Sequence, residues 1–394
     1  MFYIGIDVAK NSFQFCILHP QKGKLVSKNL PMSSKGFEDF LQTLSAYTPN
    51  HIVLESSGRF HLPLLAFLLD QDFRVSLLNP KMVHHFVRFV SANNPSKSDK
   101  KDAFLLALFA LSNPHLLKPA TLPSETKLLA RQIQKLKQEI AEAKTQIKHS
   151  LAALFPEAEK HFNVFSRAFL EILSRYPSAK RIAKAGWGKI DYILSRLPGR
   201  KPSFSAQDLV QVAQNSVGIS HKGLEKILQI YIQKIFFLQS MIEKLEKDLQ
   251  TEIETTMKTQ LECLSSIKGI SRDLASRFLA EVENIKRFSN AKKLIKYAGT
   301  DPVVKQSGKW KVRMNISKQG NPYLRNILFQ MAVGTVKWEK TFQHYFRRKY
   351  TQFRSYKKAM IAVVNKLIRV IYALSTRNQF FDPSKLAPAG VPHA

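Results

Sequence analysis

The stretch FYIGIDVAKNSFQFCILHPQKGKLVSKN, residues 2–29, decides how the first third of the chain folds. Residues 2–8 form a short apolar run that contains Asp7, and residues 12–18 have the alternating pattern of a strand. A turn rich in proline and glycine follows, so that residues 24–29 can pair back. The pattern predicts three strands joined by hairpins.

Helical and strand patterns alternate after these three strands. A helix is expected from about Ser34, a buried strand over 51–55, a helix over 62–69, a strand over 74–78 and a helix from Pro80. This order of elements is the layout of RNase H/RuvC-like domains. A doubly wound Rossmann unit would instead alternate from its first strand. The sequence therefore predicts an RNase H/RuvC-like α/β domain.

The middle of the chain carries two apolar stripes with a period of 3.5 residues. This period is typical of coiled-coil packing, and the two segments can pair as an antiparallel arm. Such stripes ordinarily form a core and carry no chemistry. Residues 155–220 between them contain several prolines and are expected to be a helical insertion, to which the sequence assigns no function. The stripes consist of Leu129, Ile133, Leu136, Ile140, Ala143 and Ile147, and of Leu224, Leu228, Tyr231, Ile235, Leu238, Ile242, Leu245 and Leu249.

The last third of the chain is basic and is predicted to be mostly helical. The segment SSIKGI, residues 265–270, is similar to a helix-hairpin-helix element, whose glycine turn points backbone N–H groups at a DNA phosphate. Gly269 can equally end a helix without touching DNA. A multidomain α/β plus α protein is therefore expected. Its parts are a RuvC-like domain at 1–120, a helical coiled-coil region with an insertion at 121–260, a C-terminal domain at 261–380 and a disordered tail at 381–394.

The charge of the chain indicates the kind of partner. The 394 residues include 61 Lys and Arg against 29 Asp and Glu, a formal net charge of +32. Residues 261–394 hold 26 basic and 7 acidic side chains, whereas residues 1–120 hold 13 and 8. Such an excess of positive charge favours a polyanion as partner, usually nucleic acid. The C-terminal third is therefore the predicted main polyanion surface.

Other features of the composition argue against several classes of protein. An anionic membrane surface is the rival partner, but no run of about 18 apolar residues could span a bilayer. The first 18 residues carry Asp7 and Lys10 inside their apolar stretch, unlike a signal peptide. Cys16 and Cys263 lie far apart without metal-ligand spacing, so neither a disulfide framework nor a zinc site is expected. A cytoplasmic protein is predicted.

Four acids occur where the predicted α/β layout would gather them. Asp7 follows one apolar strand and Glu55 ends another, so neighbouring strands would bring both carboxylates to one sheet edge. Asp99 and Asp102 start an apolar helix and share one face. Converging carboxylates suit Mg²⁺ or Mn²⁺, which also bind phosphate. Taken singly, the two helix acids can merely complement the helix dipole, and Glu55 can be a loop acid.

These residues resemble the DEDD transposases of the insertion-sequence family IS-110/IS-1111. The similarity covers nearly the whole chain, and residues 1–112 and 261–375 are the most specific parts. The resemblance implies that Asp7, Glu55 and two further acids, Asp99 and Asp102, are the four metal-binding acids of this family. The motifs are GIDVAK at 5–10, LESSG at 54–58, KSDKKDA at 97–103, YAG at 297–299, QSG at 306–308 and ISKQGNPYLR at 316–325.

The resemblance also implies a serine nucleophile in the C-terminal domain, and Ser307 matches its position. Many members of the family have a second serine where this chain has Gln306. Composition alone would favour a turn serine there. A serine hydroxyl becomes a good nucleophile once its proton is drawn off and the phosphate charge is neutralised. Basic side chains expected to bind phosphates are Lys305, Lys309, Lys311, Arg313, Lys318 and Arg325, with Lys268 in the helix-hairpin-helix-like segment.

Together these expectations describe a transposase, or site-specific recombinase, that cleaves and rejoins donor and target DNA. Ser307 would attack the phosphorus and form a 5′-phosphoserine link, which a 3′-hydroxyl of a partner strand would reverse. Two DNA partners imply a homo-oligomer, either a dimer or a tetramer. The resemblance further implies that the metal site and the serine meet across protomers, that a structured noncoding bridge RNA selects the DNA, and that the protein is nucleoid-associated in a prokaryote.

Three other functions fit parts of the sequence. A RuvC-like nuclease would hydrolyse DNA with a metal-activated water and would leave Ser307 structural. An actin-like sugar kinase or ATPase also opens with Gly-Ile-Asp, but it needs glycine-rich phosphate loops, which this chain with 15 glycines lacks. A non-catalytic nucleic-acid-binding protein would tolerate alanine at Asp7 or Glu55.

Overall fold

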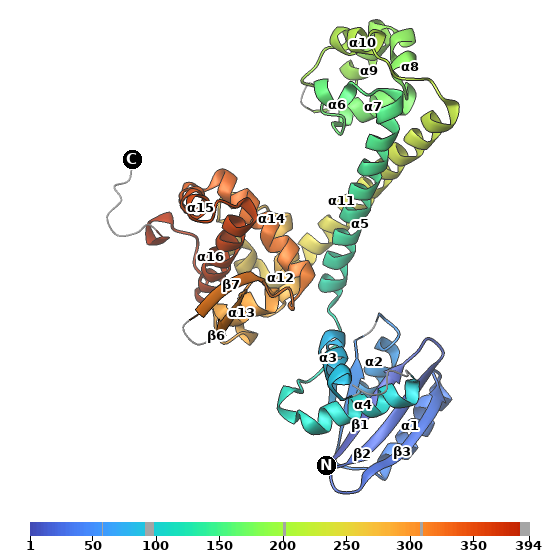
Figure 1. The fold of residues 1–394 in the computed structure, drawn as a ribbon, viewed down its shortest axis with the longest axis vertical. Coiled ribbons are helices and arrows are strands. Elements are labelled where there is room, and N and C mark those ends of the chain that lie inside the picture. The colour runs from blue at the N-terminus through green and yellow to red at the C-terminus, as the bar shows by residue number, and fades with distance from the viewer. Residues whose placement is uncertain (57, 91–97, 200–201, 308–309, 387–394) are drawn as a thin grey trace. The chain divides into compact units, whose positions relative to one another are not determined.

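The computed structural model describes residues 1–56, 58–90, 98–199, 202–307 and 310–386, with the backbone alone at residue 81 and residues 304–315. The described chain forms two compact units, Met1–Pro123 and Ser124–Ala394. Both appear in Figure 1, and each is described by itself below. The fold is mixed α/β and mostly helical, with a small sheet in the first unit.

The first unit is built on a five-stranded sheet with the order β3-β2-β1-β4-β5. β1, β2 and β3 pair antiparallel through hairpins, and β4 and β5 join β1 in parallel. This arrangement is consistent with a RuvC-like DEDD domain, as the order of elements predicted. The strands are β1 Phe2–Val8, β2 Ser12–His19, β3 Gly23–Pro31, β4 Asn50–Glu55 and β5 Val75–Leu78.

Helices cover both faces of this sheet because its central strands are apolar on both sides. Ile4 and Ile6 of β1 are buried in one cluster with side chains of α1 and α2. On the other face Cys16 and Leu18 of β2 contact Ala103 and other small residues of α4. The helices are α1 Ser34–Ser45, α2 Leu62–Asp70, α3 Pro80–Val90 and α4 Asp99–Ser112, followed by the 3-10 turn η1 Pro114–Leu116.

Gly5 sets how closely α4 approaches the sheet. A Cβ atom at this position would overlap the backbone carbonyl oxygen of Ala103 and the backbone nitrogen of Ala107. Atoms cannot share that space, so only glycine lets the backbone of α4 lie directly on β1. The part of α4 that follows its first turn is thereby held against the strand that carries Asp7.

In the second unit two long helices pack side by side as an antiparallel arm, α5 Glu125–Leu154 and α11 Lys222–Ser265 (Figure 1). Ion pairs Lys137–Glu246 and Lys234–Glu139 join the middle of α5 to α11. The buried positions follow the predicted stripes, whereas supercoiling stays a prediction. Those positions include Ile133, Leu136, Ala143 and Ile147 of α5 and Leu228, Ile235, Leu238, Ile242 and Leu249 of α11.

The insertion between these helices forms a helical cap at the end of the arm (Figure 1). Its apolar residues share one core with the adjoining parts of α5 and α11. Glu225 at the start of α11 is 4% exposed and is held by the hydroxyls of Ser178 and Ser220, each at 2.7 Å, and by Arg181. The helices are α6 Ala158–His161, α7 Arg167–Arg175, α8 Ala179–Ala185, α9 Trp187–Ser195 and α10 Ala206–Gln214.

The C-terminal part is mostly helical, as predicted, but it also contains a β-hairpin that the sequence did not indicate. Its apolar residues form one core with the opposite end of the arm, and α11 runs through residue 260 into it. The elements are α12 Arg272–Val282, η2 Ile285–Arg287, α13 Ala291–Ala298, β6 Pro302–Ser307, β7 Trp310–Ile316, α14 Pro322–Trp338, α15 Lys340–Phe353, α16 Tyr356–Arg377 and η3 Pro383–Leu386.

Gly269, in the segment similar to a helix-hairpin-helix, has a clear structural role. Its φ of +93° favours glycine, and a Cβ there would overlap the carbonyl group of Gly334 in α14. A Cβ at Gly334 would in turn overlap the carbonyl oxygen of Gly269. The two backbones therefore touch with no side chain between them. DNA contact at this turn stays a prediction.

Two expectations about the end of the chain need correction. The tail is structured as far as Leu386, because Phe381 packs on Phe342 and its backbone N–H donates to Ser266 Oγ at 2.8 Å. Residues 387–394 lie outside the described residues. Among the described helices α16 is also long and apolar enough to cross a membrane, contrary to expectation. Its apolar character is accounted for by burial, since its side chains from Ala359 to Leu374 help to form the core.

Candidate active site

The first candidate region is the edge of the sheet at the ends of β1 and β4. These strands are parallel neighbours, with Ile6 opposite Leu54. Asp7 and Glu55 are the next residues on each strand, so both acids reach the same edge. From the sequence we expected this arrangement if the two strands were neighbours, and they are neighbours in the structure.

The first turn of α4 brings the other two acids to this edge. Ser98 caps the helix, because its Oγ accepts the backbone N–H of Lys101 at 3.3 Å. Asp99 and Asp102 then stand in the first turn. Side chains alternate along a strand, so Asp7 points to the same face of the sheet as Gly5, the face on which α4 lies.

Asp7 responds electrostatically to all three of the other acids. Burial and the charges of Asp102, Asp99 and Glu55 raise the pKa of Asp7 to about 6, and the backbone N–H of Val8 opposes them weakly. Like charges disfavour ionisation of a neighbour over short distances. The influence of all three acids on Asp7 therefore indicates that the four carboxylates form one group, called here the carboxylate edge.

The carboxylate edge fits a divalent cation in its chemistry, although its ligand geometry is not formed. Four carboxylates supply the hard oxygen donors that Mg²⁺ and Mn²⁺ prefer. However, within the described ranges no three His, Cys, Asp or Glu side chains are arranged as ligands of a metal ion. Asp7, Glu55, Asp99 and Asp102 are the residues that would hold the ion.

The second candidate region is the hairpin of β6 and β7. Ser307 is the last residue of β6 and lies opposite Trp310 of β7. Lys305, Lys311 and Arg313 lie in the same two strands, but the side chains of residues 304–315 are outside the description. Lys309, which was also predicted to bind phosphate, lies outside the described residues altogether.

Two of the three C-terminal motifs, YAG at 297–299 and ISKQGNPYLR at 316–325, form the base of this hairpin. The backbone N–H of Asn321 donates to the carbonyl of Tyr297 at 2.7 Å, and that of Lys318 donates to Gly299 at 3.2 Å. Gly299 has a φ of +67°, and a Cβ at Gly299 or at Gly320 would overlap the backbone of the other. Glycine is therefore required at both positions. The end of α13 and the segment that follows β7 therefore contact each other directly through their backbones.

Three basic residues predicted to bind nucleic acid have described side chains. Lys318 is exposed at this hairpin base, and Lys268 is exposed beside Gly269. Arg325 instead points inward, and its guanidinium donates to the carbonyl of Ala298 at 3.1 Å. Burial lowers the pKa of Arg325. Arg325 thus has a structural contact that the sequence did not indicate, while phosphate binding by all three stays a prediction.

Comparison with known proteins gives the context for both regions. Residues 4–156 match a family model described as transposase, and residues 261–347 match one described as the transposase IS116/IS110/IS902 family. The matched ranges together cover well over half of the chain. The chain belongs to the IS110/IS1111 family of transposases. It is therefore a DNA transposase or recombinase, and its substrates are DNA.

Relatives of this transposase align over almost their full length. The pilin gene-inverting proteins of Moraxella bovis and Moraxella lacunata are each 24% identical, over 96% of this chain and 97% of theirs. The transposase for insertion sequence element IS1111A of Coxiella burnetii is 20% identical, over 96% of this chain and 90% of its own. These relatives share the family and the overall extent of the transposase.

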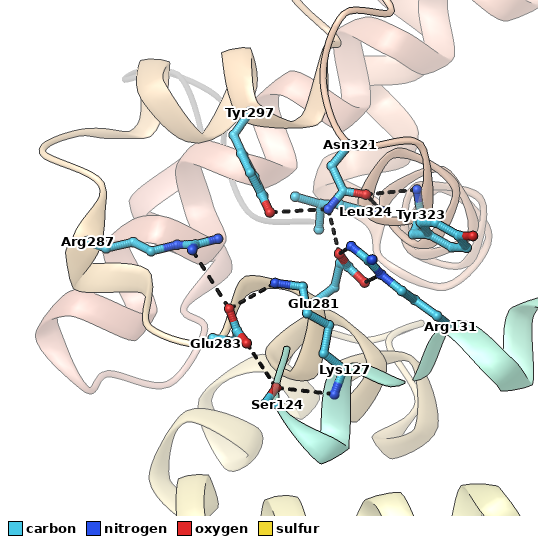
Figure 2. A network of polar contacts seen from close by, with 10 residues as sticks. All are labelled: Ser124, Lys127, Arg131, Glu281, Glu283, Arg287, Tyr297, Asn321, Tyr323 and Leu324. Carbon is cyan, nitrogen blue, oxygen red and sulfur yellow. Dashed lines mark hydrogen bonds and ion pairs between the residues drawn. The ribbon is translucent and has the colours of Figure 1, made fainter. Parts of the chain in front are cut away.

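A buried polar network anchors the hairpin base of the transposase to the arm (Figure 2). At its centre is Glu281 near the end of α12, whose side chain is fully buried. Arg131 of α5 binds it through two hydrogen bonds of 2.7 and 3.0 Å and lies over the ring of Tyr323 at 4.8 Å. Asn321 donates to Glu281 at 2.5 Å from its Nδ2. One carboxylate thereby joins α5, α12 and the start of α14.

The electrostatics of this network are balanced. Burial alone would lower the pKa of Arg131, but the hydrogen bonds and charge of Glu281 raise it above the ordinary value. Asn321 also caps α14, since its Oδ1 accepts the backbone N–H groups of Tyr323 and Leu324 at 2.9 and 3.1 Å. Every polar group of this centre has a partner, so it holds the base of the hairpin in one position.

Glu283, two residues after Glu281 and just beyond the end of α12, forms a second ion-pair centre (Figure 2). Lys127 and Ser124 of the arm each donate to its carboxylate at 2.9 Å, and Arg287 lies 3.8 Å away. Burial raises the pKa of Glu283, but these partners lower it further, to below its ordinary value. The sequence did not indicate Glu281 or Glu283, because their partners in the arm lie 150 to 159 residues away.

Proposed function

We propose that this transposase cleaves and rejoins DNA with a divalent cation, Mg²⁺ or Mn²⁺, at the carboxylate edge and with Ser307 as nucleophile. The observation that carries the proposal is the parallel pairing of β1 with β4 beneath α4, which gathers four acids from three separate segments. Burial and the three other acids disfavour the charged form of Asp7. A divalent cation among the four carboxylates would favour it, which supports the proposal.

Asp7, Glu55, Asp99 and Asp102 would hold the cation. When bound, it would neutralise the charge of the scissile phosphate and stabilise the departing oxygen. The acids themselves position the phosphate only through that ion, because a carboxylate repels a phosphate directly. A phosphate held through an ion in the first unit, and by basic residues elsewhere, fits the low net charge of the first unit compared with the basic C-terminal part.

Ser307 would perform the covalent step. Its Oγ forms a bond to phosphorus while the bond from phosphorus to the 3′ oxygen breaks, which leaves a 5′-phosphoserine and a 3′-hydroxyl. The proton lost by Ser307 is balanced by the proton that the 3′ oxygen gains. Attack by the 3′-hydroxyl of a partner strand reverses the step, so no ATP is consumed. Basic residues near Ser307, Lys305 and Lys309 among them, would neutralise the phosphates.

The proposal requires two DNA partners and therefore more than one protomer. We expect a homo-oligomer in which Ser307 of one protomer can serve the carboxylate edge of another. Mixing the inactive variants Asp7→Asn and Ser307→Ala tests this directly. Activity recovered in the mixture supports sites that are shared between protomers, and an inactive mixture contradicts it.

Strand transfer and covalent protein–DNA adducts, measured with Ser307→Ala, test the nucleophile. Loss of adducts is expected, with threonine at 307 restoring a fraction of them. Adducts that persist in Ser307→Ala would contradict the assignment of Ser307 as the nucleophile. DNA cleavage that persists without adducts would support the alternative of a RuvC-like nuclease that uses water, for which the carboxylate edge alone would suffice.

Guidance by a structured RNA is the remaining element of the proposal. Its support is the family resemblance and the basic surface, which fits RNA as well as DNA. Sequencing of the RNA that co-purifies with the full chain tests it. One abundant structured species is the expected result, and a protein that recombines specific DNA without any RNA contradicts it.

A further inference from the structure

Helix α15 and the start of α16 carry a dense positive charge that neither the carboxylate edge nor the hairpin uses. Residues 340–381 contain ten Lys and Arg and no Asp or Glu. Seven of the ten lie between residues 340 and 358. The family model that matches the C-terminal part ends at residue 347, so most of this segment lies beyond it.

Basic side chains gather on one face of α15. Lys340 and Arg347 are seven residues apart and Arg348 follows, which places all three on one side of the helix. Arg354 is the residue at which the helix ends. The opposite side is fixed in the core by Phe342, which is 1% exposed. The 14 residues of α15 span about 21 Å. Duplex DNA carries roughly twelve phosphates over such a length.

These cations have no carboxylate partners. Among the ion pairs of the described ranges, none involves a basic side chain of residues 340–377. They lie instead against neutral rings: Arg348 is 5.3 Å from the ring of Tyr345, and Lys349 is 5.5 Å from that of Phe353. A neutral ring leaves the charge of the cation intact. The arm differs, since several of its cations are paired with acids.

The start of α16 extends the same surface. Phe346 of α15 contacts Tyr356 of α16 at 5.6 Å, which joins the two helices there. Lys357 and Lys358 are exposed in the first turn of α16, with no acidic residue in that turn. Cations at the positive end of a helix dipole are unfavourable on their own and become favourable when an anion binds. This placement indicates that the surface is completed by a polyanion.

We propose that the exposed face of α15 and the start of α16 bind the phosphate backbone of duplex DNA. DNA is the substrate of this transposase, and exposed cations along the face of a helix match the regularly spaced phosphates of its backbone. Tyr350 and Tyr356, 49% and 51% exposed, flank the row and offer further contacts to sugar and phosphate. The proposal is independent of Ser307 and of the cation at the carboxylate edge.

The test compares two triple variants of the full chain that remove equal charge. One is R347A/R348A/R354A on the proposed surface, and the control is K226A/K244A/K247A on exposed positions of α11. Affinity for a duplex of arbitrary sequence is measured over a range of salt concentrations. The slope of log affinity against log salt is expected to fall by about 2.7 in the first variant, for three lost phosphate contacts. The control should leave the slope unchanged.

Four results would overturn the proposal. They are an unchanged slope in the first variant, an equal fall in the control, a loss confined to RNA, or a loss confined to vesicles of anionic lipid. R347K/R348K/R354K keeps the charge and should restore the slope. If the alanine variant unfolds, K357A/K358A replaces it, with an expected fall of about 1.8.

Discussion

The carboxylate edge and the base of the hairpin each contain several acids, but their surroundings shift the pKa of an acid in opposite directions. At the carboxylate edge burial and three neighbouring acids raise the pKa of Asp7 to about 6. At the hairpin base Glu281 and Glu283 have cationic partners, and the pKa of Glu283 is lowered. The difference teaches how surroundings separate two kinds of acid: cationic partners favour the charged form of Glu283, whereas burial and like charges disfavour that of Asp7.

Neutralising Asp7 should have the largest effect on activity. We expect Asp7→Asn to reduce strand transfer by about a thousandfold or more, which corresponds to about 4 kcal/mol in the activation barrier. The same change removes like-charge repulsion, so the metal-free protein should gain up to about 2 kcal/mol in unfolding free energy at pH 7. Strand-transfer assays and urea unfolding measure the two effects. A variant that loses both activity and stability would show that Asp7 is structural.

Neutralising Glu281 should have the opposite effect on stability. Glu281→Gln leaves Arg131 without its counter-charge, and we expect a loss of about 2–3 kcal/mol in unfolding free energy, since Arg131 is partly solvated. Covalent adduct formation should also fall, because the hairpin base loses its anchor. The matched control is Glu225→Gln in the cap of the arm, which should lower stability without affecting adducts. Equal adduct loss in the control would contradict the role given to Glu281.

A methyl group added at Gly5 tests whether the packing of α4 on β1 positions the carboxylate edge. Gly5→Ala forces α4 away from β1, and we expect a loss of about 2 kcal/mol in stability and about a tenfold weaker binding of Mn²⁺. Gly188→Ala in α9 is the control, because a Cβ there meets no atom within 4 Å. It should be neutral or slightly stabilising. Unchanged Mn²⁺ binding in Gly5→Ala would contradict the coupling of α4 to the carboxylate edge.

The smallest effect concerns pH. Because the folded-state pKa of Asp7 is about 6 and its ordinary value is 3.8, the folded protein binds more protons between these values. The contribution of Asp7 to the stability of the metal-free protein therefore falls as pH rises from about 4 to 6. Mn²⁺ must displace this proton, so its affinity should fall by up to about tenfold per pH unit below 6. A flat affinity from pH 5 to 8 would contradict the shifted pKa.

Much of the first unit could be predicted because its signals are local. Alternation and turn residues located β1, β2 and β3, and the apolar run before Glu55 located β4 to within one residue. The grouping of Asp7 with Glu55 needed only the adjacency of two strands. The distance of α4 from the sheet was not predictable, since the space at Gly5 depends on the packing of a helix a hundred residues later.

The second unit was less predictable because its decisive contacts are remote in sequence. Nothing near Glu281 indicates that Arg131 lies against it, and the hairpin of β6 and β7 was concealed by its many basic residues. By contrast, the basic run from Lys340 to Lys358, which contains no acid, can be read from the sequence alone and could have indicated a surface for a polyanion. The signature glycines Gly299 and Gly320 pointed to a special site, and their role is the close contact at the hairpin base.

The facing pair of Gly269 and Gly334 limits how this chain can change. When one of two contacting residues becomes larger, the other can usually become smaller to make room. Neither Gly269 nor Gly334 can become smaller, so a substitution at one cannot be compensated at the other. A saturation screen of function should therefore find both positions intolerant of every replacement, including alanine, however the rest of the sequence drifts.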